Sequence, residues 1–210
     1  MSVSMSKLRQ IFLVIYLSMQ VFAISAQELP PFCTKDCVVD YGEVLGETES
    51  GVKAFSNCNN SCVNPTPYFI DQIFTGIKWQ CVEYARRWLL LNKGVVYGDV
   101  DVAADIWRLE YVTNPGTKSN TPFLSILNGS SQHGLQRGDL LIYSRAFYDT
   151  GHVAVVLKVD EQKQRLYLGE QNYDNGLWQQ GYARDIPYVK HEDGVWVLDP
   201  FLIGWKRVAN

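Results

Sequence analysis

Apolar positions recur with helical spacing near the middle of the 210-residue chain. Between residues 80 and 92, Val82, Ala85 and Leu89 follow the i, i+3, i+7 spacing of one helix face. Gly94 comes directly after this segment, and glycine commonly ends a helix. The pattern therefore predicts a helix over residues 80–92.

The segments on either side of this helix have different patterns. A second helix is expected over residues 102–111, with Ile106 and Trp107 facing inward, before Asn114-Pro115-Gly116 breaks the chain. Residues 27–67 are rich in Gly, Asn, Pro and Cys, which is typical of an irregular segment with short extended pieces.

The second half of the chain contains short runs of apolar and β-branched residues that predict strands. We expect them over residues 139–143, 152–157, 165–170, 178–184, 195–198 and 203–207. The polar segment 160–164 predicts a turn, so that 152–157 and 165–170 pair as an antiparallel hairpin. Helices followed by strands predict an α+β fold, with N-terminal helices packed on an antiparallel β-sheet.

Composition and charge narrow the class of protein. The chain is 47% hydrophobic, 13% aromatic and 20% charged, which fits one globular domain with a core and argues against disorder. The formal net charge is -3, so the chain has no strong positive field. Binding to nucleic acid or to an anionic membrane is therefore not expected as its main role.

The first residues have the pattern of a secretory signal peptide. Lys7 and Arg9 precede the apolar run 11–17, and small residues follow up to Ala26. We predict a signal peptide over residues 1–26, with cleavage three residues earlier as the alternative. An uncleaved membrane anchor is the rival interpretation, but the apolar run is short for a span. The mature protein is expected to be secreted or periplasmic, without stable membrane insertion.

The number and spacing of the cysteines agree with export. Four of the five cysteines form two similar pairs, Cys33 with Cys37 and Cys58 with Cys62 in sequence, and Cys81 stands apart. Exported proteins tend to pair their cysteines in disulfides. A zinc site is the rival interpretation, but no histidine lies near the four in sequence. The sequence leaves all three pairings open.

Cys81 is the candidate nucleophile. It stands at the start of the helix predicted over residues 80–92, where free backbone N–H groups and the helix dipole favour an anion. A thiolate is the nucleophilic form of cysteine, so this position favours nucleophilic catalysis. The rival interpretation is a buried structural cysteine.

His152 is the candidate base. It opens a strongly apolar predicted strand, whereas His133 and His191 lie in polar loops. A histidine at a strand's start can face a cleft while the strand is held in the core, and a cysteine nucleophile needs such a base. The rival interpretation is a turn histidine with no role.

The predicted hairpin brings further polar residues toward His152. Glu170 ends the second strand and would accept a hydrogen bond from the imidazole, with Asn172 as the alternative for this role. The rival interpretation of Glu170 is a surface carboxylate. Gln80, directly before Cys81, is a candidate donor to the oxyanion together with the Cys81 backbone N–H, or else a capping or surface residue.

At this point the sequence resembles the cysteine, histidine-dependent amidohydrolase/peptidase (CHAP) family, and within it the amidase domains of glutathionylspermidine synthetase/amidase and trypanothione synthetase. The matching segments are Phe55-Ser56-Asn57-Cys58, Phe74-Thr75-Gly76-Ile77-Lys78-Trp79-Gln80-Cys81-Val82-Glu83-Tyr84-Ala85-Arg86-Arg87, Thr150-Gly151-His152-Val153-Ala154, Glu170-Gln171-Asn172 and Leu202-Ile203-Gly204-Trp205. The resemblance implies a papain-like fold over residues 51–210, preceded by a disulfide-bearing arm over residues 27–50.

The resemblance also implies roles for individual residues. It implies a Cys-His-Glu arrangement of Cys81, His152 and Glu170, and a substrate-binding role for Arg86 and Asn172. A guanidinium at position 86 could bind a carboxylate with two hydrogen bonds. The rival interpretation of Arg86 is a solvated side chain paired with the carboxylate three residues before it.

The expected activity is hydrolysis of an amide through a thioester, with no metal or organic cofactor. Two substrates remain open: a glutathione–polyamine conjugate, by resemblance, and a peptidoglycan peptide, by the expected location. The amidase domains of this family are cytoplasmic and usually fused to an ATP-using synthetase, whereas this chain has an apparent export signal and extra cysteines. A non-catalytic binding module with the same fold is the alternative from another class.

Overall fold

The computed structural model describes residue 31 and residues 33–130 and 134–209. The predicted signal peptide over residues 1–26 lies outside the described residues. No helix within the described residues is both long enough and apolar enough to cross a membrane.

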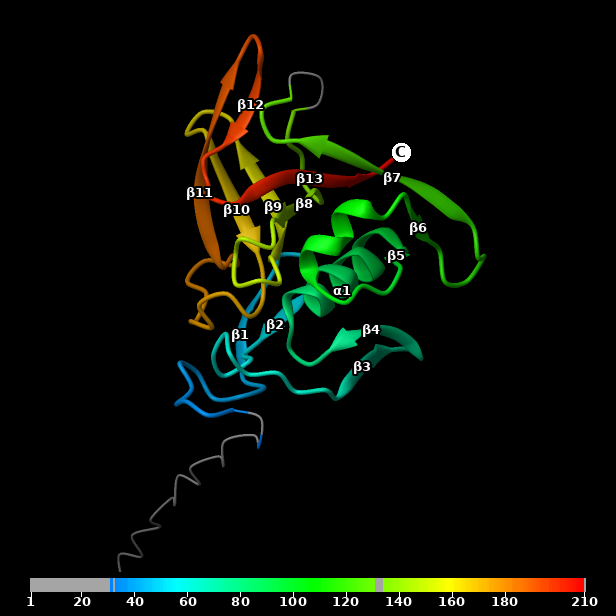
Figure 1. Cartoon of the computed structure of the whole chain (residues 1–210), viewed down its shortest axis with the longest axis vertical. Coiled ribbons are helices and arrows are strands. Elements are labelled where there is room, and N and C mark those ends of the chain that lie inside the picture. The colour runs from blue at the N-terminus through cyan, green and yellow to red at the C-terminus, as the bar shows by residue number, and fades with distance from the viewer. Residues whose placement is uncertain (1–30, 32, 131–133, 210) are drawn as a thin grey trace, which may run out of the picture.

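A nine-stranded antiparallel sheet is the largest element of the described chain (Figure 1). Its strands, in the order in which they lie side by side, are β12 (Gly194–Val197), β11 (Arg184–His191), β10 (Arg165–Gly169), β9 (Val153–Asp160), β8 (Leu140–Tyr143), β13 (Leu202–Val208), β7 (Asn120–Leu127), β6 (Tyr111–Thr113) and β5 (Val96–Tyr97). The order from β11 to β8 follows consecutive hairpins, whereas β13 inserts between β8 and β7 from the far end of the chain.

The predicted helix at residues 80–92 is confirmed as α1 (Cys81–Lys93). Gly94 ends it in the left-handed conformation, with φ 67°, and its N–H donates to the carbonyl of Leu90. The segment predicted as a second helix forms only the short 3₁₀-helix η1 (Ala103–Arg108) and then strand β6.

The expected layer of N-terminal helices on the sheet is not borne out. Within the described residues there is one α-helix and one 3₁₀-helix, and four short strands precede both. These strands are β1 (Val44–Glu47), β2 (Lys53–Phe55), β3 (Pro67–Ile70) and β4 (Ile73–Ile77). The Gly, Asn and Pro residues of this region favour turns over helix, in agreement with the short extended pieces expected there.

Five of the six strands predicted in the second half are present, as β8, β9, β10, β12 and β13. The strand predicted over residues 178–184 is wrong, because Gly181 turns the chain with φ 75° and pairing of β11 begins only at Arg184. Trp178, apolar and aromatic, packs instead against Tyr84 of α1, and its N–H donates to the carbonyl of Leu45.

Apolar residues pack on both faces of the central strands. Alternate residues of β8 and β9 point to opposite faces, so Ile142 and Val155 join the cluster around α1 while Leu141 and Val156 join a second cluster. The second cluster is formed by side chains of β7 to β13. Helix α1 packs on β9 and β4. This packing holds the first residue of α1 near the N-terminal end of β9.

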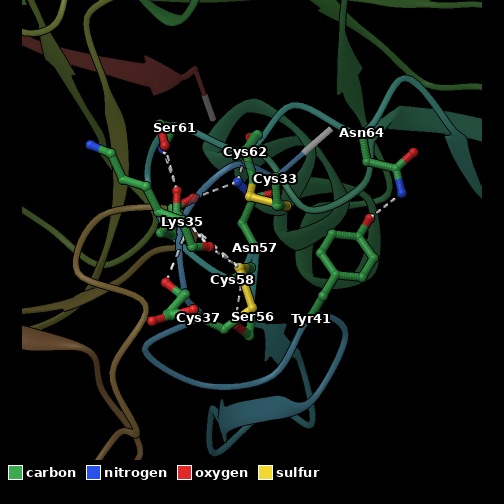
Figure 2. Close-up of a disulfide and its surroundings, with 12 residues drawn as sticks. Cys33, Lys35, Cys37, Tyr41, Ser56, Asn57, Cys58, Ser61, Cys62 and Asn64 are labelled. Carbon is green, nitrogen blue, oxygen red and sulfur yellow. Dashed lines mark hydrogen bonds between the residues drawn. A yellow bond between two sulfur atoms is a disulfide. The ribbon is translucent and has the colours of Figure 1, made fainter. Parts of the chain in front are cut away.

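Two disulfides tie the N-terminal arm to the loop before β3 (Figure 2). Cys33 pairs with Cys62 and Cys37 pairs with Cys58, which selects one of the three pairings left open by the sequence. Cys81 is the free cysteine of the described residues. The cross-links and the β1–β2 pairing both connect the arm to residues beyond position 50.

Candidate active site

Cys81 is the first residue of α1 and faces a pocket. The residue before it, Gln80, is extended with φ -82° and ψ 157° and makes no side-chain capping bond to the helix. The N–H groups of the first turn are therefore not capped by the Gln80 side chain, and they favour negative charge at Cys81. The thiol is buried, with 8% of the residue exposed, and lines a pocket of about 500 Å³.

His152 and Glu170 meet at the open end of the β9–β10 hairpin. His152 directly precedes β9, Glu170 directly follows β10, and Gly169 pairs with Val155 in the ladder between them. The Nε2 atom of His152 lies 2.8 Å from Oε2 of Glu170. This bond leaves Nδ1 to interact with Cys81, and it confirms that Glu170 contacts the imidazole.

Gly151 explains why the loop before His152 can approach the sheet so closely. Its φ is 70°, and a Cβ atom placed there would lie 2.4 Å from the carbonyl oxygen of Tyr143. Glycine is the residue that accepts both conditions without strain. The Thr150-Gly151-His152 segment is thus held against β8, with the imidazole directed toward Cys81.

The imidazole is fully buried but its charged form is favoured. Burial alone lowers the pKa of His152, because it removes water from the imidazolium. The negative charge of Cys81 and hydrogen bonds to Cys81 and Glu170 outweigh this effect and raise the pKa to about 9. At neutral pH the imidazole is therefore favoured in its charged form beside the Cys81 sulfur.

Glu170 is held by groups that the sequence did not reveal. Burial favours its neutral form, but the positive charge of Arg184 and the hydrogen bond with His152 lower the pKa of Glu170 below its usual value. Arg184 Nε donates to Glu170 Oε1 at 2.6 Å, and its Nη1 donates to Asp199 at 2.7 Å. Tyr143 also donates to Asp199, at 2.7 Å, so a charged network fixes the carboxylate behind the imidazole.

The other predicted site residues line the same pocket: Gln80, Arg86 and Asn172. Gln80 and Asn172 contact each other, since Asn172 Nδ2 donates to Gln80 Oε1 at 2.8 Å. The Gln80 Nε2 atom lies 3.2 Å from both Asn57 Oδ1 and the Cys62 carbonyl oxygen. To serve an oxyanion, this amide has to release one of these acceptors.

Arg86 is buried rather than solvated, with 2% of its surface exposed. It does not pair with Glu83, which bonds Arg87 instead at 2.6 Å. Arg86 Nη1 lies 2.9 Å from the exposed carboxylate of Asp99, and Nη2 donates to the Gly98 carbonyl. Its buried Nε has no partner, so the guanidinium retains an unused donor.

The remaining histidines do not contribute to this arrangement in the described residues. His191 is exposed, but it is the last residue of strand β11 and does not lie in a loop as expected. His133 lies outside the described residues. Sequence reasoning missed Asn57, Arg184 and Asp199, because each reaches the site through contacts with residues distant in sequence.

A thiol at a helix start, an adjacent imidazole and a carboxylate behind the imidazole form the arrangement of a cysteine-dependent hydrolase. The family model described as CHAP domain matches residues 72–172, which include all three groups. This part of the chain belongs to the CHAP domain family.

Curated relatives extend the likeness beyond that match. The chain is 33% identical over 175 residues to trypanothione synthetase of Crithidia fasciculata, covering 83% of this chain and 26% of the relative. It is 34% identical over 182 residues to the bifunctional glutathionylspermidine synthetase/amidase of Escherichia coli, covering 79% and 29%. The chain thus spans between a quarter and a third of the length of these relatives. Together, family and relatives support a cysteine amidohydrolase at the level of the family.

Proposed function

We propose that the protein hydrolyses an amide bond through a thioester on Cys81. The observation that carries this proposal is the contact of one imidazole with both the helix-start thiol and the buried Glu170 carboxylate. Burial excludes most water from the pair, so the interaction between the opposite charges is stronger than in solution.

The proposed reaction has two stages, the formation of a thioester and its hydrolysis. The Cys81 thiolate attacks the amide carbon, a C–S bond forms, and the carbonyl electrons move to oxygen. The backbone N–H of Cys81 and the Gln80 amide stabilise this oxyanion. The carbonyl then re-forms, the C–N bond breaks, and His152 gives its proton to the leaving amine. Water next attacks the thioester while His152 takes its proton, which releases the acid and restores the thiolate.

The substrate we favour is a glutathione–polyamine amide. The relative named a glutathionylspermidine synthetase/amidase is similar over most of this chain. Arg86 lines the pocket, and its positive charge suits a substrate carboxylate. Asp101 lines the same pocket, and its negative charge suits an ammonium group of a polyamine.

A peptidoglycan peptide is the second candidate substrate, favoured by the signal-peptide pattern over residues 1–26. Cross-bridge and stem peptides are also amides, so the same chemistry would cleave them. We propose that the protein is exported whichever of the two substrates it cleaves. N-terminal sequencing of the protein recovered from the medium or periplasm tests this proposal. Recovery of the protein only in the cytoplasm would argue against export.

The decisive experiment incubates the protein separately with glutathionylspermidine and with peptidoglycan fragments and identifies products by mass spectrometry. We expect glutathione and spermidine from the first substrate. Cys81→Ala is expected to abolish turnover, because no other group supplies the nucleophile. Its thermal unfolding midpoint should stay near that of the wild type, since only one sulfur atom is removed.

Each outcome separates the candidates. Cleavage of peptidoglycan alone would select the cell-wall substrate, and binding of either compound without cleavage would support a non-catalytic module. Undiminished turnover by pure Cys81→Ala protein would refute the mechanism.

A further inference from the structure

Asn57 lies in the disulfide-bonded loop and is fully buried (Figure 2). Cys58 follows Asn57 directly, and Cys62 lies five residues after Asn57, so both disulfides end in this loop. A buried carboxamide requires hydrogen-bond partners, and those of Asn57 come from three separate parts of the chain.

The side chain of Asn57 belongs to a closed ring of three amides. Gln80 Nε2 donates to Asn57 Oδ1 at 3.2 Å, and Asn57 Nδ2 donates to Asn172 Oδ1 at 3.0 Å. Asn172 Nδ2 closes the ring by donating to Gln80 Oε1 at 2.8 Å. Each amide donates to the next, so the ring fixes which end of the Gln80 amide carries the hydrogens.

Asn57 has a second contact that affects Gln80. Its Nδ2 lies 2.7 Å from the Cys62 carbonyl oxygen, closer than to its two other acceptors, the Asn59 carbonyl oxygen and Asn172 Oδ1, which are both at 3.0 Å. Gln80 Nε2 lies 3.2 Å from the same Cys62 oxygen. The carbonyl therefore keeps its shorter hydrogen bond when Gln80 withdraws. One N–H of Gln80 can leave Cys62 at low cost, because no buried acceptor is left without a donor.

We propose that Asn57 is a positioning residue that orients the Gln80 amide through the three-amide ring and satisfies the Cys62 carbonyl, so that one Gln80 N–H becomes free for the oxyanion formed at Cys81. The proposal rests on the proposed function, since it assigns Gln80 to the oxyanion. Asn57 is too engaged in protein contacts to bind substrate itself, and it acts through Gln80.

The disulfides explain how this loop can serve a catalytic purpose. Cys33 and Cys37 hold Cys62 and Cys58, which lie at the two ends of the short segment whose Asn59 and Cys62 carbonyl oxygens lie within hydrogen-bond distance of Asn57 Nδ2. The Asn57 backbone N–H also donates to Asn175 Oδ1 at 2.9 Å, which joins the loop to the segment after Glu170. A catalytic amide needs placement within a fraction of an ångström, and such multiple fixation provides it.

The test compares two reactions of the same sulfur. Acylation of Cys81 by p-nitrophenyl acetate passes through an oxyanion, whereas alkylation by iodoacetamide does not. We expect Asn57→Ala to lower the acylation rate by about 10- to 100-fold, as for loss of alignment of an oxyanion donor. Alkylation should continue at nearly the wild-type rate, because it requires only the thiolate–imidazolium pair.

A double-mutant cycle shows whether Asn57 acts through Gln80. Gln80→Ala alone and Gln80→Ala/Asn57→Ala should lose the same factor in acylation, because the second change then removes nothing further. If the double variant instead lost the product of the two single-variant factors in acylation rate, the proposal would be overturned. Unchanged acylation in Asn57→Ala, or an equal fall of both reactions, would also overturn it.

Asn59→Ala is the matched control from the same loop. Asn59 is buried and bonds Lys35 and Ser61 rather than Gln80, so its loss should lower stability but not acylation. If Asn57→Ala does not fold, Asn57→Ser carries the same expectation, because its hydroxyl is too short to reach both Gln80 and Cys62. Failure of the proposed function is recognised separately: wild-type Cys81 would then react with neither reagent.

Discussion

The proton on His152 is the residue-scale feature on which the proposed chemistry depends most. The folded protein raises the pKa of His152 from 6.5 to about 9, against the effect of burial. A raised histidine pKa stabilises the fold fully below the unfolded value of 6.5, and this contribution disappears as the pH rises through about 9. The protonated imidazole is also the group that would donate to the leaving amine.

We therefore expect the acylation rate measured with an amide substrate to fall as the pH rises through about 9. The reason is that a neutral imidazole has no proton to give to the leaving nitrogen. Initial rates across neutral to alkaline pH check this expectation, and an ester with a good leaving group serves as control because it needs no proton. A rate that stays constant across the alkaline range would contradict the assignment of His152.

At the scale of elements, strand pairing positions the carboxylate. Leu168 of β10 pairs with Arg184 of β11, and this register brings the guanidinium to the Glu170 carboxylate that follows β10. The β9–β10 pairing brings the same carboxylate to His152. The two strands that flank β10 thus place hydrogen-bond partners on both oxygens of the Glu170 carboxylate, which fixes its orientation.

Arg184→Met is expected to destabilise the fold by about 3 kcal/mol, because Glu170 and Asp199 lose the guanidinium that pairs with both carboxylates. The pKa of Glu170 should rise, since the charge that lowers it is lost. A lowered carboxyl pKa stabilises the fold above the unfolded value and loses this effect as the pH falls, so the variant should show a weaker acid dependence of stability. Urea unfolding at several pH values measures both effects. Arg145→Met, which breaks an exposed pair with Asp105, is the control and should change little.

The sequence could predict those elements that neighbouring residues in the chain determine, but not those that depend on contacts with distant residues. Dense apolar runs gave β8, β9 and β10, but β7 was missed because only Phe123 and Ile126 of its eight residues are buried. A tight turn between the two strands allowed the His152–Glu170 contact to be inferred from the sequence. Arg184 has no such local signal, because β11 follows an irregular segment and its register is set by packing.

The whole molecule assembles its site from widely separated segments. Helix α1 supplies Cys81, the β9–β10 hairpin supplies His152 and Glu170, and the disulfide-bonded loop before β3 contributes Asn57. The sheet and α1 are joined by an apolar core, whereas the arm also depends on two covalent cross-links. The contribution of the cross-links to the free energy of unfolding can therefore be removed by mutation without changing the apolar core.

Replacement of one disulfide, as in Cys33→Ser/Cys62→Ser, should lower the free energy of unfolding by about 3 kcal/mol. The bond closes a segment with a sequence separation of 29, and its loss gives the unfolded chain more freedom. Urea unfolding with and without a reductant measures the change. A variant lacking all four disulfide-bonded cysteines is the control, because its midpoint should not respond to reductant. If the midpoint of the wild type did not respond either, the four cysteines would not be paired in solution, and no covalent cross-link would hold the loop that carries Asn57.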